Sequence, residues 1–194
     1  MNRILFISIV SMTSYGCSNI NTNVDEKRSI NDMVYTGPVL RAQAEKVIPQ
    51  SKETQELIDL LIAKANTGNN AVGLAAPQLG IRKSVFIYRV PNITNGIPEF
   101  PRTWEVALNP SYSPISKEVT LMSEGCFSVP HFYSKSVPRY KEISFRYQSI
   151  NGDWHETIVN GYKSQILQHE TDHLNGILYI NKIQPKNLRL LLKK

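Results

Sequence analysis

The sequence predicts an α+β fold, and three observations favour it. Strand-like segments cluster in the middle of the chain and precede one long helical segment, residues 162–174, instead of alternating with helices. The dipeptide Asn151-Gly152 separates two strand-like segments, 142–150 and 154–159, as in a tight antiparallel hairpin. The chain of 194 residues is long enough for one domain with a hydrophobic core and short for two.

The first half of the chain should contain one helix. Ser51 is a suitable N-cap for a helix running to Asn66, and Leu57, Leu61 and Ala65 recur at a spacing that places them on one core-facing side. Around this helix we expect a turn into a short extended segment at 36–41 and strands at 84–90, 104–109 and 118–122.

The last part of the chain begins where helix 162–174 ends. Asn175-Gly176 should close that helix in a left-handed conformation. A strand-like piece follows at 177–183, and Pro185 is suited to open a final helix over residues 185–192.

The composition is that of an ordinary globular protein, with 41% apolar and 20% charged residues. A net charge of +6 suits an anionic partner such as ribosomal RNA, and it suits a merely soluble surface equally well. Two cysteines, Cys17 and Cys126, do not make a disulfide framework.

The most informative segment is Gln168-His169-Glu170-Thr171-Asp172-His173, which contains H-E-x-x-H. On a helix, His169 and His173 point the same way and can share one metal ion. Glu170 then lies where its carboxylate reaches a water on that metal. This is the arrangement of a hydrolytic metal site.

The third ligand must come from upstream, because residues 174–194 contain no Asp, Glu or His. The candidates are a carboxylate, His131, His155, Cys17 and Cys126. We favour Cys126, which follows Gly125 in a segment that Pro130 closes, because a thiolate and two imidazoles leave a fourth position open for catalysis. His131 and His155 are interpreted as ordinary surface or structural residues.

Three segments together resemble the signature motifs of the peptide deformylases: Gly73-Leu74-Ala75-Ala76-Pro77-Gln78, Glu124-Gly125-Cys126-Phe127-Ser128 and Gln168 to His173. They occur in that family's order, and the resemblance covers about residues 33–185. It implies small mixed and antiparallel sheets packed around a central metal-binding α-helix. It also implies an enzyme that removes the formyl group from the N-terminal formylmethionine of nascent polypeptides and releases formate.

The resemblance implies roles for individual residues. Cys126, His169 and His173 would hold the metal, and Glu170 would transfer protons. The side-chain amide of Gln78 and the backbone N–H of Phe127 would stabilise the oxyanion. The residues that would contact the substrate are Gly73, Leu74, Gly125 and Phe127. Behind the site, Glu124 and Arg139 are candidates for an ion pair and Asp172 for orienting a ligand histidine.

The expected cofactor is one divalent metal ion. Sulfur with imidazole suits Zn, Fe(II), Co or Ni, and the family implies Fe(II). The family further implies a cytoplasmic monomer that can dock on the ribosome through a basic C-terminal helix. Three positions depart from the commonest family pattern: Ala71 replaces a Gly, Phe127 replaces Leu, and Tyr133 replaces an Arg.

Residues 1–32 are expected to be an N-terminal extension of a single catalytic domain, 33–194. Arg3 precedes an apolar run, 4–12, that is too short to span a membrane as a helix but resembles a secretory signal. Cys17 follows a small residue, as in a lipoprotein cleavage site. The alternatives are therefore an exported lipoprotein, an organelle-targeting segment, or a start codon assigned too early.

Two rival functions use the same residues. A metallopeptidase would share the helix and the water but would cleave internal peptide bonds. A structural metal module or an inactive paralogue would need neither Glu170 nor Gln78, and a structural site prefers four protein ligands. The presence of Glu170 and Gln78 therefore favours an enzyme.

Overall fold

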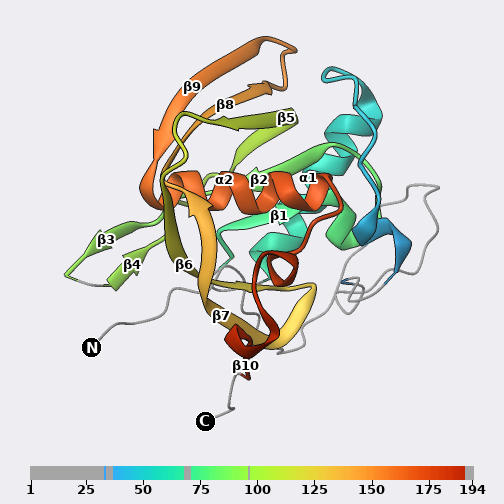
Figure 1. Cartoon of the computed structure of the whole chain (residues 1–194). Coiled ribbons are helices and arrows are strands. Elements are labelled where there is room, and N and C mark those ends of the chain that lie inside the picture. The colour runs from blue at the N-terminus through green and yellow to red at the C-terminus, as the bar shows by residue number, and fades with distance from the viewer. Residues whose placement is uncertain (1–32, 34–36, 68–70, 96, 191–194) are drawn as a thin grey trace.

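A computed structural model describes residues 33, 37–67, 71–95 and 97–190, which form antiparallel sheets and two α-helices (Figure 1). The predicted α+β class is confirmed. In this part of the chain, every pairing between named strands is antiparallel, and the one parallel contact is an isolated bridge between Glu45 and Lys83. The extension 1–32, with Cys17, lies outside the described residues.

The largest sheet has five strands in the order β1-β2-β5-β8-β9. Their bounds are Gly73–Ala75, Val85–Tyr88, Glu105–Pro114, Glu142–Gln148 and Trp154–Asn160. The predicted β8–β9 hairpin is confirmed by a continuous register from Glu142↔Asn160 to Gln148↔Trp154. The short strand β1 lies at one edge of this sheet and β9 at the other.

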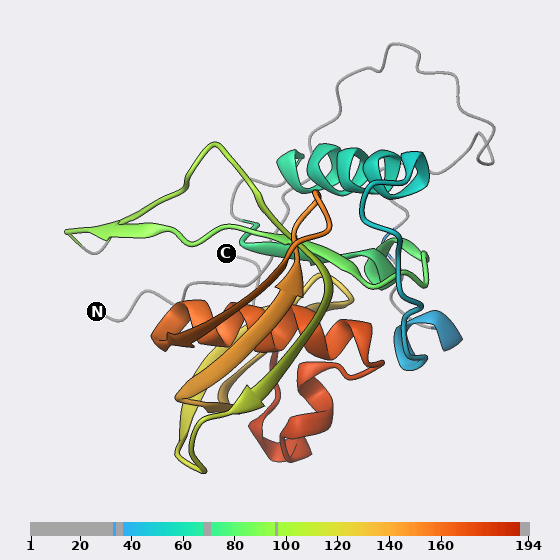
Figure 2. The ribbon, with the colours of Figure 1, turned by 90° about the horizontal axis from the view of Figure 1, so that it is seen from above.

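A second sheet carries the predicted cysteine segment. Strand β6 (Val119–Cys126) and strand β7 (Val129–Tyr140) form a long hairpin, and β10 (Arg189–Leu190) pairs with β7. A third, two-stranded sheet of β3 (Asn92–Thr94) and β4 (Ile97–Glu99) projects from the body of the molecule (Figure 2).

Helices α1 (Lys52–Asn66) and α2 (Gly161–Leu174) cover opposite faces of the large sheet (Figure 2). The alternation of side chains along β2 explains this arrangement, because Val85 and Ile87 pack in the cluster with α1, whereas Phe86 and Tyr88 pack in the cluster with α2. Ser51 caps α1 as predicted, its hydroxyl accepting from the Thr54 N–H at 3.2 Å.

Helix α2 is buried on all sides between the large sheet and the β6–β7 hairpin (Figure 1). Every residue from Ser164 to Leu174 is buried, including charged and polar ones. Since buried polar groups require partners, the polar side chains of this helix must be satisfied inside the protein. No helix in the described part of the chain has the length and apolar character needed to cross a bilayer.

Helix α2 ends as predicted, with Gly176 in the left-handed region at φ 72°. A Cβ at Gly176 would lie 2.5 Å from the backbone carbonyl of Arg41, so only glycine fits. The Ala44 N–H also donates to the Leu174 carbonyl at 2.7 Å. The segment 41–44 therefore lies against the end of the metal-site helix.

Several expectations about connecting segments are wrong. Residues Pro38–Arg41 form a 3-10 helix instead of an extended segment, and Tyr179–Lys182 form another where a strand-like piece was expected. In the second case the Asn181 side chain accepts from the Leu178 N–H at 2.9 Å and closes a turn.

The predicted final helix, 185–192, is also wrong within the described residues. Pro185–Asn187 form one 3-10 turn, and the chain then extends because Arg189 and Leu190 pair with Tyr133 and Phe132 of β7. Residues 185–190 therefore do not form the basic helix that was expected to dock on the ribosome. Residues 191–194 lie outside the described part.

Candidate metal centre

Three side chains with metal-binding atoms meet between α2 and the end of β6. His169 and His173 lie one helical turn apart, and their Nε2 atoms are 3.2 Å from each other. The Sγ atom of Cys126 lies 3.3 Å from Nε2 of His173. All three residues are buried, and their ligand atoms lie within 4.8 Å of one another.

The spacing of these atoms fits a tetrahedral metal ion. With metal–nitrogen and metal–sulfur bonds of about 2.0 and 2.3 Å, a tetrahedral ion would place its ligand nitrogens about 3.3 Å apart and sulfur about 3.5 Å from nitrogen. The observed separations of 3.2 and 3.3 Å lie close to these values. No fourth His, Cys, Asp or Glu of the described residues joins the group, so a four-coordinate ion held by the triad would have one position for a ligand from outside this group.

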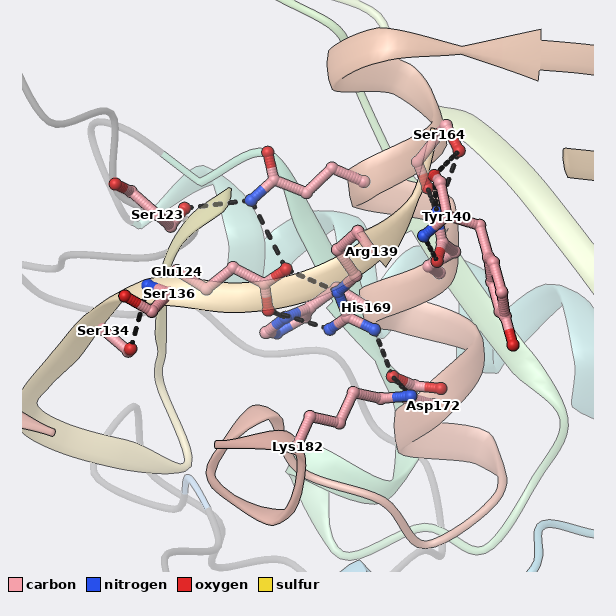
Figure 3. A network of polar contacts seen from close by, with 12 residues as sticks. Ser123, Glu124, Ser134, Ser136, Arg139, Tyr140, Ser164, His169, Asp172 and Lys182 are labelled. Carbon is pink, nitrogen blue, oxygen red and sulfur yellow. Dashed lines mark hydrogen bonds and ion pairs between the residues drawn. The ribbon is translucent and has the colours of Figure 1, made fainter. Parts of the chain in front are cut away.

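The buried ion pair of Glu124 and Arg139 supports His169 from behind (Figure 3). Glu124 Oε2 lies 2.8 Å from Nδ1 of His169, and the Arg139 guanidinium binds the same carboxylate through Nε at 2.6 Å and Nη2 at 2.8 Å. Burial opposes ionisation of Glu124, but Arg139 outweighs it and lowers the pKa to about 2. The carboxylate therefore stays charged and accepts the Nδ1–H, which leaves the Nε2 lone pair of His169 for a metal.

Asp172 extends this network. The expectation that it orients a ligand histidine was wrong. The Oδ2 of Asp172 pairs with Arg139 Nη1 and lies 3.2 Å from Lys182 Nζ (Figure 3). Its Oδ1 accepts from the Tyr112 hydroxyl at 3.2 Å. The expectation was wrong because Asp172, one residue before His173, faces β7 and the 3-10 helix that contains Lys182. Glu124 on β6 performs the orienting contact instead.

Gln168 fixes α2 against the end of β7. Its side-chain amide accepts from the Tyr140 N–H at 3.0 Å and donates to the Tyr140 carbonyl at 2.9 Å, as an adjacent strand would. The same amide donates to the Ser164 hydroxyl at 2.9 Å. These contacts set the rotation of α2 and therefore the direction of both imidazoles.

Glu170 lies directly against the backbone of β1. A Cβ at Gly73 would be 2.2 Å from Glu170 Oε1, so the carboxylate occupies the space that a side chain would need. Its Oε2 is buried and has no hydrogen-bond partner in the protein. Burial raises the pKa of Glu170 to about 7, which suits a group that accepts and returns a proton near neutrality.

Gln78 lies on the other side of the cysteine, in the 3-10 helix Ala76–Leu79. Its Oε1 accepts from the Ala75 N–H at 2.9 Å, which fixes the orientation of the amide group. Its Nε2 then faces Cys126 Sγ at 3.6 Å. A neutral N–H donor is therefore held at the edge of the ligand triad.

The strand β1 that carries Gly73 pairs with β2 alone in the described chain, so its other edge has no strand partner, although all three of its residues are buried. An extended peptide can add to such an edge through backbone hydrogen bonds. The Leu74 side chain points into the core cluster with α1, so only its backbone can serve a ligand. Phe127, at the β6–β7 turn, packs its ring against the same cluster.

The comparison with known families agrees with this geometry. Residues 30–189 match the model of the polypeptide deformylase family. The chain belongs to the polypeptide deformylase family.

Relatives and solved structures extend the match over most of the chain. A peptide deformylase from Thermotoga petrophila is 35% identical over 161 residues, which are 83% of this chain and 90% of that protein. Peptide deformylase 2 of Rickettsia conorii is 32% identical and covers 92% of this chain and 87% of its own length. The structure resembles a Met-Ala-Ser-bound class I type b peptide deformylase from Acinetobacter baumannii, with a TM-score of 0.69, 33% identity and coverage of 78% and 96%.

The structure brings the residues carried over from the family resemblance into one region. Cys126, His169 and His173 form one group that Gln78 contacts, Glu170 follows His169 and lies against Gly73 on β1, and Gly125 precedes Cys126 on β6. His131 and His155 lie exposed on β7 and β9, outside the triad. Sequence reasoning missed Gln168, Lys182 and Tyr112, because only the packing of α2 against β5 and β7 shows what they contact.

Proposed function

We propose that this member of the deformylase family removes the formyl group from the N-terminal formylmethionine of nascent polypeptides. The reaction adds water across the formamide C–N bond, so a C–O bond forms, and formate and a free methionyl amine leave. The observation that carries the proposal is the buried Cys126–His169–His173 triad with Glu170 beside it, in a chain that matches the family over residues 30–189.

A divalent metal held by the triad would lower the pKa of a water and polarise the formyl oxygen. Thiolate and imidazole ligands suit Fe(II), Ni, Co or Zn, and we propose Fe(II) as the native ion. Such a site should lose activity in air, because the thiolate of Cys126 is open to oxidation.

The chain's own groups do the remaining work. Glu170 takes a proton from the attacking water and later delivers one to the leaving nitrogen, a role that its pKa of about 7 supports. Gln78 Nε2 and the backbone N–H of Phe127 donate to the developing oxyanion. The unpaired edge of β1 at Gly73 and Leu74 holds the substrate backbone, and Gly125 on β6 contacts the substrate as well.

The decisive assay measures formate released from formyl-Met-Ala by protein loaded anaerobically with Fe(II) or Ni(II). We expect release by the wild type and at least a hundredfold loss in Glu170→Gln, which keeps the shape of the side chain. Metal content measured in both proteins separates a lost base from a lost metal. A metal-replete wild-type protein that releases no formate would falsify the proposal.

The same assay addresses the metallopeptidase alternative. A deformylase should not accept acetyl-Met-Ala, because the additional methyl crowds a site that fits a formyl hydrogen. Cleavage of internal peptide bonds, or equal rates on acetyl and formyl substrates, would favour a peptidase instead.

We further propose that residues 33–194 form the catalytic domain, that it acts as a monomer in the cytoplasm, and that residues 1–32 are an extension. The family match beginning at residue 30 supports this division. The exported-lipoprotein alternative requires lipid on Cys17. Incorporation of labelled lipid by the wild type but not by Cys17→Ala would decide for it.

A further inference from the structure

The open edge strand β1 is short and requires support at both ends. It has three residues, and its ladder with β2 covers only Gly73↔Tyr88, Leu74↔Ile87 and Ala75↔Phe86. The carboxyl end of β1 is held by Gln78, which accepts the Ala75 N–H. The amino end is held by a residue that none of the signature motifs contains, Arg89.

Arg89 binds two consecutive carbonyls just before β1. Its backbone N–H donates to the Val72 carbonyl at 2.9 Å, and its side-chain Nε donates to the Ala71 carbonyl at 2.8 Å. Ala71 and Val72 are fully buried, so water cannot replace these donors. The Ala71 carbonyl would lose this charged partner without the guanidinium.

The guanidinium is itself held in place by aromatic rings. It lies 4.4 Å from the ring centroid of Trp104 and 4.9 Å from that of Phe100, and its Nη1 donates to the Pro101 carbonyl at 3.2 Å. Trp104 is fixed in turn, because its indole N–H donates to Asn66 at the end of α1 at 2.9 Å. Arg89 therefore joins the entry of β1 to the β4–β5 connection and to α1.

We propose that Arg89 is a positioning residue that holds the amino end of β1 in line, so that a peptide substrate can pair along the open edge of this strand. The proposal rests on the proposed function for its substrate. A guanidinium suits this position because its planar N–H groups can donate to separate carbonyls while its faces stack on aromatic rings. Lysine keeps the positive charge but lacks the planar set of N–H donors.

The test compares Arg89→Met and Arg89→Lys with the wild type, all metal-loaded. The matched control is Arg146→Met, because Arg146 also stacks on a tryptophan, Trp154, at 4.0 Å, but on strands β8 and β9. The substrates are formyl-Met-Ala-Ser, whose backbone reaches along β1, and formyl-Met, which ends after one residue.

We expect Arg89→Met to raise KM for formyl-Met-Ala-Ser about fivefold while kcat stays within about twofold, as for the loss of one hydrogen bond that aligns substrate. KM for formyl-Met should change much less, and Arg89→Lys should lie between. Arg146→Met should match the wild type. A general loss of folding would instead affect both substrates equally, and that result would overturn the proposal.

Hydrogen exchange provides a readout that does not depend on activity. Amides of residues 71–75 should exchange faster in Arg89→Met than in the wild type or Arg146→Met, with exchange elsewhere unchanged. Unchanged exchange there would overturn the proposal. If the wild type releases no formate, the proposed function fails, and faster exchange confined to 71–75 still supports the positioning role. If Arg89→Met does not fold, Arg89→Lys carries both measurements, and wild-type values in both would refute the role.

Discussion

Gly73 is the residue whose size matters most to the proposed chemistry. A Cβ at Gly73 would lie 2.2 Å from Oε1 of Glu170, and the pairing of β1 with β2 restrains the backbone of β1 from shifting. The close approach of strand and carboxylate therefore depends on the absence of one carbon atom.

Gly73→Ala should displace Glu170 and reduce kcat for formyl-Met-Ala by about a hundredfold, since a misplacement of about 1 Å has an effect of that size. Metal content should stay at the wild-type level because the ligand atoms do not touch Gly73. The control is Gly152→Ala in the distant β8–β9 turn, where the nearest atom to the added Cβ lies 3.9 Å away. Wild-type kcat in Gly73→Ala would show that Glu170 does not need its present position.

The elements are joined at the metal centre through buried charges. Glu124 on β6, Arg139 on β7 and Asp172 on α2 are each at most 2% exposed, and Lys182 adds the 3-10 helix that follows. Removing one charge from such a network leaves its partners buried without compensation. The network thus links the alignment of three elements to the orientation of one imidazole.

Glu124→Gln keeps the side-chain shape but removes the charge that holds the Nδ1–H of His169. We expect metal affinity to fall about 10- to 100-fold, as for other second-layer partners of metal-binding histidines. Competition with a chromophoric chelator measures it. Glu118→Gln is the control, because Glu118 pairs with Lys141 on the surface, where side chains are more than half exposed. Equal affinities in the two variants would contradict the role of Glu124.

Gly176 has a corresponding structural role at the end of α2. Gly176→Ala should lower the free energy of unfolding by about 2 kcal/mol or more, because it adds left-handed strain and forces the Arg41 carbonyl away. Gly152→Ala, also at positive φ but without a close neighbour, should lose only the strain contribution of about 1 kcal/mol. Denaturant unfolding measures both, and equal losses would mean that the contact with Arg41 is unimportant.

The elements differed in how far the sequence could predict them. Helix α1 and the β8–β9 hairpin follow from a cap, a periodicity and a two-residue turn, all of which are local signals. Strand β7 was missed because Pro130 and Pro138 interrupt its pattern. The strand accommodates them because its second edge is covered only where β10 pairs with Phe132 and Tyr133. The prediction of a final helix was wrong because Arg189 and Leu190 pair with β7, and such a long-range contact leaves no local signal in the sequence.

The site was more predictable than the connections around it. The four-residue spacing in H-E-x-x-H predicts that both histidines lie on one face of a helix. Because no ligand follows the motif, Cys126 was the best candidate for the third ligand. The residues that support the metal-ligand candidates were harder to predict, because whether Glu124 or Asp172 faces a histidine depends on the rotation of α2 against β6. Arg89 carries no motif at all, and its importance follows only from the carbonyls and rings that surround it.

A metal ion held by Cys126, His169 and His173 would tie the only polar buried helix of the described chain to the second sheet. A ligand that binds the folded state alone raises stability by mass action, by about 4 kcal/mol at a thousandfold excess over Kd. Cys126 comes from β6 and both histidines from α2, so the gain opposes separation of the sheet from the helix.

Removing the metal with a chelator should therefore lower Tm by roughly 10 °C. Cys126→Ser should show a much smaller response to chelator, because it has lost the strongest ligand. His155→Ala should respond like the wild type, since His155 lies on β9, stacked on Tyr147. Calorimetry with and without chelator tests this, and identical responses in all three proteins would exclude the triad as the binding site.

The contact between the two ends of the folded body has a consequence for biosynthesis. The Arg41 guanidinium donates a hydrogen bond to the side chain of Asn181, 140 residues later in the chain. The nearby Ala44 N–H donates to the Leu174 carbonyl at the end of α2. The helix α2, which contains both histidines, is translated only after every strand of the large sheet. A metal ion that requires Cys126 and both imidazoles could therefore bind only after α2 has been translated, later than every strand of the large sheet.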